Sequence, residues 1–283
     1  MIKYALILIL FAEHLFAQTV SENLHVTYIA NEGFMLQTKS KRVLIDALFT
    51  NGYGAFPTPS QSTLKKIVNA DPPFDQVATY LLTHYHGDHA DSKLIRAYLT
   101  RHPEMKLITS LPSLVFIDGE EFGFVKLEKQ FVEMTPKQNM SISQTINGID
   151  VKAMAIKHLS FFQDGVDIEK YMFNLGYYVK LDGIGILHTG DASMETFKNY
   201  MEKNTHLKSP VDVAFVYFDM LKNGKADIDY LMKTINPKHI VIMHVWESAY
   251  EEWSQKVEEL KNYFPNLWFP KVEMETKIYN LDR

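Results

Sequence analysis

Along the first half of the chain, short runs of hydrophobic residues alternate with segments whose hydrophobic residues recur at helical spacing. Residues 94–99 show the helical pattern, and Asp91 before them is a residue type that caps a helix, here one that ends at Arg101. Strands are predicted over residues 25–29, 34–38, 42–46, 77–82 and 106–109, and helices over residues 62–70, 91–101 and, briefly, after residue 109.

The second half of the chain repeats this alternation. Strands are predicted over residues 149–156, 173–181, 185–188, 211–216 and 239–243, and helices over residues 193–202, 227–235 and 250–263. Two strand-rich halves with helices between the strands favour an α/β (α+β) fold, in which a pair of sheets is covered by helices on the outside. Because no linker separates the halves, we expect one domain over residues 18–283.

Residues 1–17 have the composition of a secretory signal peptide. A lysine at position 3 precedes the apolar residues 4–12, and a more polar stretch then ends at the small residue Ala17, after which cleavage is expected. The apolar run is shorter than the about 20 residues that span a bilayer. The pattern predicts a periplasmic or secreted protein with no stable membrane anchor after cleavage; a buried first strand or helix is the alternative.

Composition narrows the possible chemistry. The 283 residues are 46% hydrophobic and carry a net charge of -5, so the chain can bury a large core but lacks the basic surface that nucleic acid requires. We therefore expect a small-molecule substrate and no nucleic-acid partner. Cysteine is absent, which excludes disulfides, thiolate catalysis and cysteine-ligated metal centres. Any metal must be held by His, Asp or Glu, which favours zinc, manganese or iron over copper(I).

A cluster of potential metal ligands lies directly after the fourth predicted strand. In an extended segment the side chains of His84 and His86 point to the same side, so both can reach one ion. Gly87 allows a sharp turn, after which Asp88 and His89 would leave in another direction and could hold a second ion. The plain alternative is a solvated polar loop, but such a loop has no reason to follow a buried strand with these ligands in this order.

At this point the chain resembles the metallo-beta-lactamase superfamily, whose signature H-x-H-x-D-H after a buried strand is matched by residues 84–89. The resemblance extends from Val26 to the C-terminal strands. Three later elements of the family also match in order: a histidine after a strand at His158, a motif such as H-T-G-D at residues 188–191, and a histidine after a late strand at His244. The resemblance implies a four-layer αββα sandwich of two mixed β-sheets flanked by helices.

The resemblance also implies a site for two metal ions, with zinc as the default and manganese or iron as alternatives. The first ion would bind His84, His86 and His158, the second Asp88, His89 and His244, and Asp191 would bridge them. A hydroxide between the ions would be the nucleophile, because metal binding lowers the pKa of water from about 15.7 towards 7. Asp88 is the expected catalytic side chain, orienting the hydroxide or moving its proton to the leaving group.

Within the superfamily the chain most resembles the lactonase-like and phosphodiesterase-like branch, the ascorbate-6-phosphate lactonase type, through residues 28–34, 45–46 and 174–177. True beta-lactamases commonly use a cysteine ligand or lack the bridging aspartate, so Asp191 leads away from antibiotic hydrolysis. The expected activity is hydrolysis of an ester, lactone, amide or phosphodiester. The alternatives are a catalytically silent metal-binding or sensory protein and a diiron oxidoreductase, which typically has Glu at the position of His86.

Several further residues are candidates for supporting roles. His188 and Asp46 lie at strand ends, where they could hydrogen-bond a metal ligand. Residues in loops or at strand ends that could contact a substrate are Tyr53, Phe56, Phe161, Phe162, Tyr217, Lys222 and Lys225. The histidines expected to be structural or exposed are His25, His102, His206 and His239.

Overall fold

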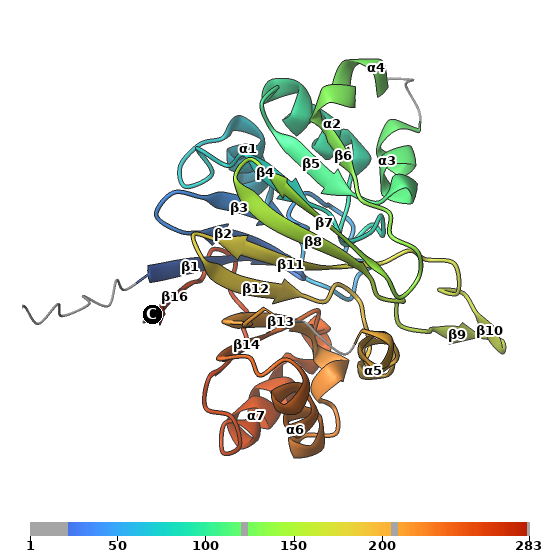
Figure 1. Cartoon of the computed structure of the whole chain (residues 1–283), viewed down its shortest axis with the longest axis vertical. Coiled ribbons are helices and arrows are strands. Elements are labelled where there is room, and N and C mark those ends of the chain that lie inside the picture. The colour runs from blue at the N-terminus through green and yellow to red at the C-terminus, as the bar shows by residue number, and fades with distance from the viewer. Residues whose placement is uncertain (1–21, 120–123, 205–208, 282–283) are drawn as a thin grey trace, which may run out of the picture.

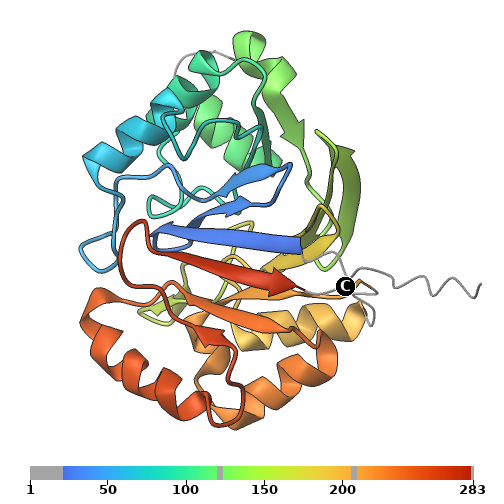
Figure 2. The same ribbon diagram turned by 90° about the vertical axis from the view of Figure 1, so that its left-hand side faces the viewer.

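Two seven-stranded sheets packed face to face form the centre of the protein, in a computed structural model that describes residues 22–119, 124–204 and 209–281. Helices cover the outer face of each sheet (Figure 1), and the view at a right angle shows the four layers in succession (Figure 2). The predicted αββα sandwich of two mixed sheets is therefore confirmed. The signal-peptide prediction concerns residues 1–17, which lie outside the described residues.

The first sheet has the strand order β16-β1-β2-β3-β4-β5-β6, antiparallel from β16 to β3 and parallel from β3 to β6. Its strands are β1 (Glu22–Ala30), β2 (Gly33–Gln37), β3 (Arg42–Ile45), β4 (Thr79–Leu81), β5 (Lys106–Thr109), β6 (Phe131–Glu133) and β16 (Thr276–Leu281). The helices on this side are α1 (Gln61–Asn69), α2 (Ser92–Arg101), α3 (Leu111–Asp118), α4 (Phe124–Leu127) and the short 3-10 turn η1 (Glu128–Gln130).

The second sheet has the order β15-β14-β13-β12-β11-β8-β7, parallel from β15 to β12 and antiparallel from β12 to β7. Its strands are β7 (Ser141–Ile146), β8 (Ile149–Ala155), β11 (Leu175–Leu181), β12 (Ile184–His188), β13 (Val213–Tyr217), β14 (His239–Met243) and β15 (Leu267–Trp268). Its helices are α5 (Met194–Lys203), α6 (Lys225–Thr234) and α7 (Tyr250–Leu260), with the 3-10 turns η2 (Phe218–Leu221) and η3 (Glu247–Ala249).

Three hydrophobic clusters hold these layers together. One lies between the sheets, where the rings of Phe34 on β2 and Phe215 on β13 approach to 4.7 Å between centroids. The other two lie between each sheet and its helices. Asp91 caps α2 as predicted, accepting from the backbone N–H groups of Lys93 and Leu94.

Strands β6, β7, β15 and β16 of the two sheets were not predicted, and neither was a small hairpin. Strand β16 completes the first sheet beside β1, and the hairpin of β9 (Phe162–Gln163) and β10 (Val166–Asp167) occupies part of the segment 159–170, which was expected to be a loop. The predicted strand over residues 77–82 is shorter, because only Thr79 to Leu81 pair with both neighbours. Among the described residues, no helix is both long and apolar enough to cross a membrane.

Helix α5 is attached to the second sheet by a buried face that includes Phe197, which is fully buried. We expect Phe197→Ala to lower the free energy of unfolding by about 3–5 kcal/mol, because it removes a buried ring and leaves a cavity. Tyr263→Ala, at an exposed aromatic residue after α7, should change the free energy of unfolding by no more than about 0.5 kcal/mol. Chemical denaturation measures the free energy of unfolding of both variants. Equal losses in the two would contradict the role of Phe197 in attaching α5 to the second sheet.

Candidate metal centre

The predicted ligands lie on loops that leave the ends of four strands. Residues 84–89 follow β4 of the first sheet, whereas His158, Asp191 and His244 follow β8, β12 and β14 of the second. Loops at such strand ends are the usual place for sites in layered folds. The structure brings all the predicted ligands into one cluster, in which every residue except His86 is buried.

The first predicted set forms a compact group. The ligand atoms of His84, His86, His158 and Asp191 all lie within 4.8 Å of one another. His84 Nε2 lies 3.0 Å from His86 Nδ1, and His158 Nε2 lies 3.3 Å from Asp191 Oδ2. Imidazole nitrogens together with a carboxylate oxygen are a donor set that fits zinc.

The second predicted set, Asp88, His89 and His244, forms a neighbouring group whose ligand atoms also lie within 4.8 Å of one another. His244 Nε2 lies 3.3 Å from His89 Nε2 and 3.2 Å from Asp88 Oδ2. Asn31 Nδ2, from the turn between β1 and β2, donates to the same Asp88 oxygen at 3.2 Å. The carboxylate of Asp88 is therefore fixed from two sides.

Asp191 lies between the two groups. Its Oδ2 atom is 3.8 Å from His84 Nε2 in the first group and 3.2 Å from His244 Nε2 in the second. Its Oδ1 atom is 3.3 Å from His89 Nε2, and its backbone N–H donates to Asn174 Oδ1 at 3.2 Å. This position fits the bridging role that the sequence predicts.

The buried polar atoms of this cluster do not satisfy one another. Over the described part of the chain, His158 Nε2, His244 Nδ1, Asp191 Oδ1 and both carboxylate oxygens of Glu32 are buried without a hydrogen-bond partner. A buried polar group left unpaired costs about 1–3 kcal/mol, and a buried charge costs more. Bound cations would remove this cost, and His and carboxylate donors fit zinc, manganese or iron.

Asp46 supports the second group by a hydrogen bond, as its place at a strand end suggests. Its Oδ2 atom lies 3.0 Å from His89 Nδ1, and Thr83 donates to both carboxylate oxygens, from its hydroxyl at 2.6 Å and its backbone N–H at 2.9 Å. His89 is thereby oriented with Nε2 facing His244. Asp46 (φ 41°) and His244 (φ 62°) both adopt left-handed backbone, a conformation that costs energy and is concentrated at functional sites.

His188 supports the centre through backbone groups. Its Nδ1 atom accepts from the N–H of Gly190 at 3.2 Å, and its Nε2 lies 3.3 Å from the carbonyl oxygen of Glu32. His188 therefore connects the loop that carries Asp191 to the β1–β2 turn of the other sheet. Burial lowers the pKa of His188 to about 4, so the ring is neutral and can accept and donate at once.

In the metal-free protein His84 and His86 of the first group differ in charge from His244 of the second. Burial lowers the pKa of His84 well below its usual value and that of His86 to about 4. Burial also acts to lower the pKa of His244, but Asp191 and Asp88 outweigh it and raise that pKa to about 10. Burial acts to raise the pKa of Asp191, yet the adjacent histidines, His244 foremost, hold it well below its usual value.

The sequence did not reveal three residues of the centre. Asn31 and Glu32 lie in the β1–β2 turn, where polar residues normally face solvent, and nothing in the pattern distinguishes them from a surface turn. Glu169 follows β10, and its Oε2 atom lies 3.2 Å from His86 Nε2. The signal that could have revealed Asn31 and Glu32 is the antiparallel order β1-β2-β3, which places the β1–β2 turn at the same edge of the sheet as Asp46 after β3.

Aromatic residues lie on two sides of the centre. The ring centroids of Phe56 and Tyr217 lie 4.2 and 5.1 Å from that of His244. The Tyr53 hydroxyl accepts from the N–H of Gly87 at 2.8 Å, so Tyr53 holds the turn within the histidine cluster. These three predicted residues therefore lie beside the candidate ligands.

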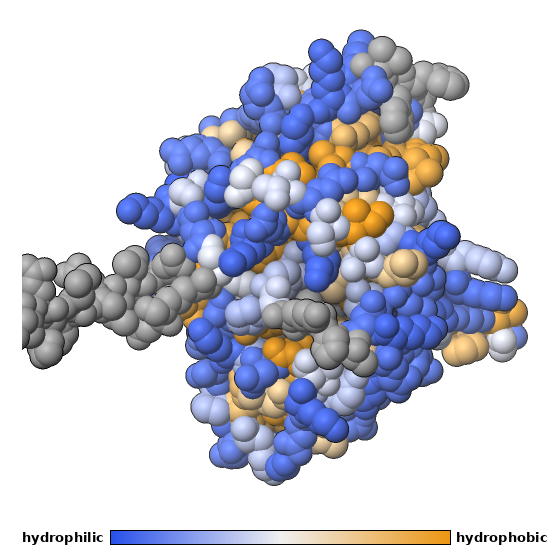
Figure 3. All heavy atoms as spheres, viewed as in Figure 1, coloured by the Kyte–Doolittle hydropathy of each residue, from blue (hydrophilic) through white to orange (hydrophobic). Residues whose placement is uncertain are grey.

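Two exposed hydrophobic surfaces flank the histidine cluster. Figure 3 shows hydrophobic residues over α3 and on the β9–β10 hairpin. Tyr85 in the cluster stacks on Phe116 of α3 at 5.5 Å, while Glu169 connects the hairpin to His86. The exposed members are Leu111, Val115 and Phe116 on α3, and Phe161, Phe162, Val166, Ile168 and Tyr171 on and beside the hairpin.

The other candidates lie apart from the ligands. Lys222 pairs with Asp219 at 2.9 Å and Lys225 with Asp229 at 2.5 Å, as expected of a solvated surface. His25, His102 and His239 are half-buried and belong to neither ligand group, and His206 lies outside the described residues.

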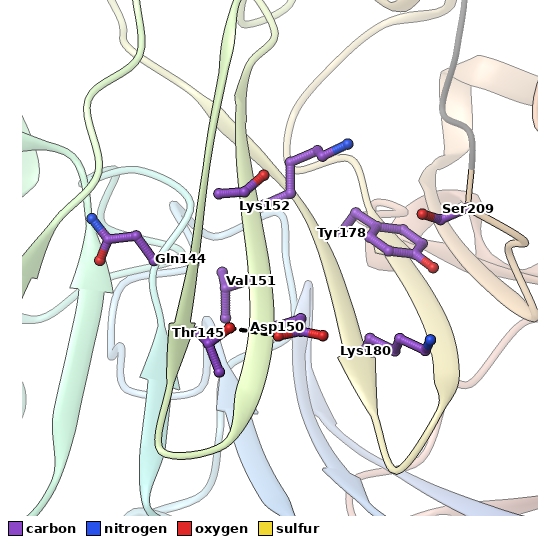
Figure 4. A pocket seen from close by; sticks show the side chains of 9 residues that line it. Gln144, Thr145, Asp150, Val151, Lys152, Tyr178, Lys180 and Ser209 are labelled. Atoms are coloured by element: carbon purple, nitrogen blue, oxygen red, sulfur yellow. Dashed lines mark hydrogen bonds between the residues drawn. The ribbon is translucent and has the colours of Figure 1, made fainter.

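A separate hollow lies over β7, β8 and β11 (Figure 4). Its lining contains none of the candidate ligands and consists of Ser143, Gln144, Thr145, Asp150, Val151, Lys152, Tyr178, Lys180 and Ser209. Thr145 donates to Asp150 at 2.6 Å within it. No buried, unpaired side-chain atom of the described residues belongs to this lining, in contrast to the histidine cluster.

A four-layer sandwich with a buried His and Asp cluster at the strand ends is the architecture of metallo-beta-lactamase fold proteins. Residues 25–244 match the family model described as "Beta-lactamase superfamily domain", and the chain belongs to this family. The family predicted from the H-x-H-x-D-H motif is therefore confirmed.

Relatives and solved structures agree with this assignment. The chain is similar to a UPF0173 metal-dependent hydrolase of Pyrococcus furiosus, with 25% identity over 77% of this chain and 83% of the relative. In fold it is similar to the isothiocyanate hydrolase from Delia radicum gut bacteria (TM-score 0.60, 16% identity, 91% and 100% coverage). It is also similar to the metallo hydrolase Igni18 from Ignicoccus hospitalis (TM-score 0.57, 18% identity, 92% and 100% coverage). The Pyrococcus relative is named a metal-dependent hydrolase, in agreement with the predicted enzyme class, and the two solved structures agree with the fold.

Replacing Asp46 tests its support of the second group. Asp46→Asn removes the charge that orients His89, so we expect metal affinity to fall by about 10–100-fold. Competition with a chromogenic chelator measures this. Asp229→Asn, an exposed carboxylate on α6, is the control and should bind metal like wild type; equal affinity in both variants would contradict the role of Asp46.

Metal binding should also release protons. A ligand histidine must be deprotonated, and His244 is protonated at about pH 7.5 because its pKa is raised to about 10. Calorimetry in buffers of different ionisation enthalpy should therefore detect proton release on metal binding. The number of protons released should decrease as pH rises through about 10. Lowering the pH should weaken binding for the same reason. Identical heats in all buffers would contradict the charge state of His244.

Proposed function

We propose that this chain is a metal-dependent hydrolase that holds two divalent ions, zinc by default and manganese or iron otherwise. It would cleave an ester, lactone, amide or phosphodiester bond of a small molecule. The observation that carries the proposal is Asp191, within 3.8 Å of His84 and 3.2 Å of His244, between two groups of candidate ligands. The hydrolase names of the relatives support the same reaction class.

When bound, the ions would bring the pKa of a water molecule towards about 7 and polarise the scissile carbonyl or phosphoryl group. His84 and His86 are neutral in the metal-free protein, which is the form that binds a metal ion. Burial acts to raise the pKa of Asp88, but His89 and His244 outweigh it, so its pKa lies below the usual value. The ionised Asp88 can take the proton of the attacking water and pass it to the leaving group.

The surroundings favour a substrate with a hydrophobic part. Exposed apolar residues on α3 and on the β9–β10 hairpin flank the cluster, and Phe56 and Tyr217 lie beside His244. Apolar walls with a few convergent polar groups are typical of sites for small organic ligands. We therefore favour an uncharged ester or lactone with an aromatic or aliphatic substituent.

Export is part of the proposal and rests on residues 1–17. The catalytically silent alternative would keep the same metal groups without turnover. Fractionation of cells that express the full chain tests export. The assay below tests whether the protein is catalytically silent.

Chelation tests the proposed reaction. The metal-loaded protein should hydrolyse nitrophenyl esters or simple lactones, lose this activity on chelation and regain it with zinc or manganese. Asp191→Asn should lower kcat at least about a hundredfold. It removes the carboxylate charge that lies between the two ligand groups and so weakens the electrostatic stabilisation of the transition state. Lys225→Ala, at an exposed lysine on α6, is the control and should keep full activity. Activity that persists without metal would contradict the proposal, and metal binding without any turnover would favour the silent alternative.

A further inference from the structure

Glu32 is a buried carboxylate with no assigned partner. It lies in the β1–β2 turn, its side chain is fully buried, and neither carboxylate oxygen has a hydrogen-bond partner among the described residues. A carboxylate removed from water in this way is strongly destabilising unless a cation or several donors compensate it. The position of Glu32 therefore requires an explanation.

Glu32 has candidate neighbours on two sides. On one side, Oε2 lies 3.9 Å from His89 Nδ1, but that nitrogen is 3.0 Å from Asp46 Oδ2 and an imidazole N–H has one direction to donate. Both oxygens of Asp46 also accept from Thr83, so this side is already satisfied. On the other side, the ligand atoms of Glu32, Asp191 and His244 lie within 4.8 Å of one another.

The β1–β2 turn holds Glu32 rigidly at this place. Asn31, with left-handed φ of 49°, donates from its side chain to the backbone oxygen of Asp88 at 3.2 Å as well as to its carboxylate. Gly33 leaves no room for a side chain, because an added Cβ would lie 2.7 Å from the carbonyl oxygen of Asp46. With His188 on the carbonyl of Glu32, the turn is attached to both sheets.

We propose that Glu32 is a further metal ligand, which joins Asp88, His89 and His244 around the second ion. The inference rests on the proposed two-ion function and deepens it. With Asp191, the second ion would have carboxylate oxygens from three residues and imidazole nitrogens from two, whereas the first has three imidazoles and one carboxylate. Carboxylate-rich sets suit manganese and iron better than imidazole-rich ones. The two positions therefore differ in metal preference, with zinc favoured at the first and manganese or iron at the second.

Glu32→Gln tests this assignment with little change in shape. Metal-stripped wild type, titrated with Mn2+ against a competing chelator, should bind two ions. The variant should keep one binding step and weaken the other at least about tenfold. With Co2+, whose absorption reports coordination number, the spectrum of the variant should change at the weakened site.

Thermal stability gives an independent readout. Glu32→Gln keeps the size of the side chain but removes a ligand oxygen, so the rise in Tm that added metal produces should be smaller than in wild type. Asp227→Asn is the matched control: it changes a buried carboxylate of α6, outside the centre, that accepts from the N–H of Asn223 at 2.8 Å. This control should lower Tm with and without metal and leave the metal-induced shift unchanged.

Glu32→Asp separates charge from reach, because it keeps the carboxylate and retracts it by one methylene. It should weaken binding of the second ion, although the carboxylate is still present. If Glu32→Gln binds both ions with wild-type affinity, or gains as much Tm from added metal as wild type does, the role of Glu32 is overturned while the two-ion proposal stands. Should wild type itself bind no more than one ion, both proposals are overturned.

Discussion

The structure depends on the burial of several imidazoles and carboxylates in one place without enough hydrogen-bond donors to satisfy them. Asp191 is at the centre of this arrangement, within 3.3 Å of His158, His89 and His244 at the same time. Protonated histidines can compensate part of its charge, and Asp191 itself raises the pKa of the adjacent His244 to about 10 in the metal-free protein. Divalent cations would compensate it more completely, because they also engage the imidazoles that burial keeps neutral.

The sandwich supplies the rigidity that such a cluster needs. The ligands lie in loops directly after strands of both sheets, so the packed cores set the separation of the points from which these loops leave. A second layer of contacts then fixes each side chain: Asp46 orients His89, Asn31 holds Asp88, and His188 connects the two sheets beneath them. The left-handed backbone at Asp46 and His244 is energetically unfavourable, and the surrounding contacts hold it in place.

Much of the fold could be predicted from the sequence, because apolar runs and helix caps act locally. The cap at Asp91 and the strand before His84 are examples. The ligand cluster could also be predicted, since metal ligands need particular residue types at particular strand ends. Glu32 and Glu169 could not be, because their roles arise only when a hairpin turn and a distant loop fold against the cluster. Strand β16 likewise depends on the free edge of β1, a tertiary fact that no local pattern contains.

The two ligand groups are unequal in composition, yet they share one carboxylate, and the account requires both to hold an ion. The most direct test is anomalous X-ray scattering at the metal edge from crystals of the metal-loaded protein. The account predicts two peaks in each chain on opposite sides of Asp191, one beside His84 and His158, the other beside His89 and His244. A single peak, or peaks that do not flank Asp191, would contradict it.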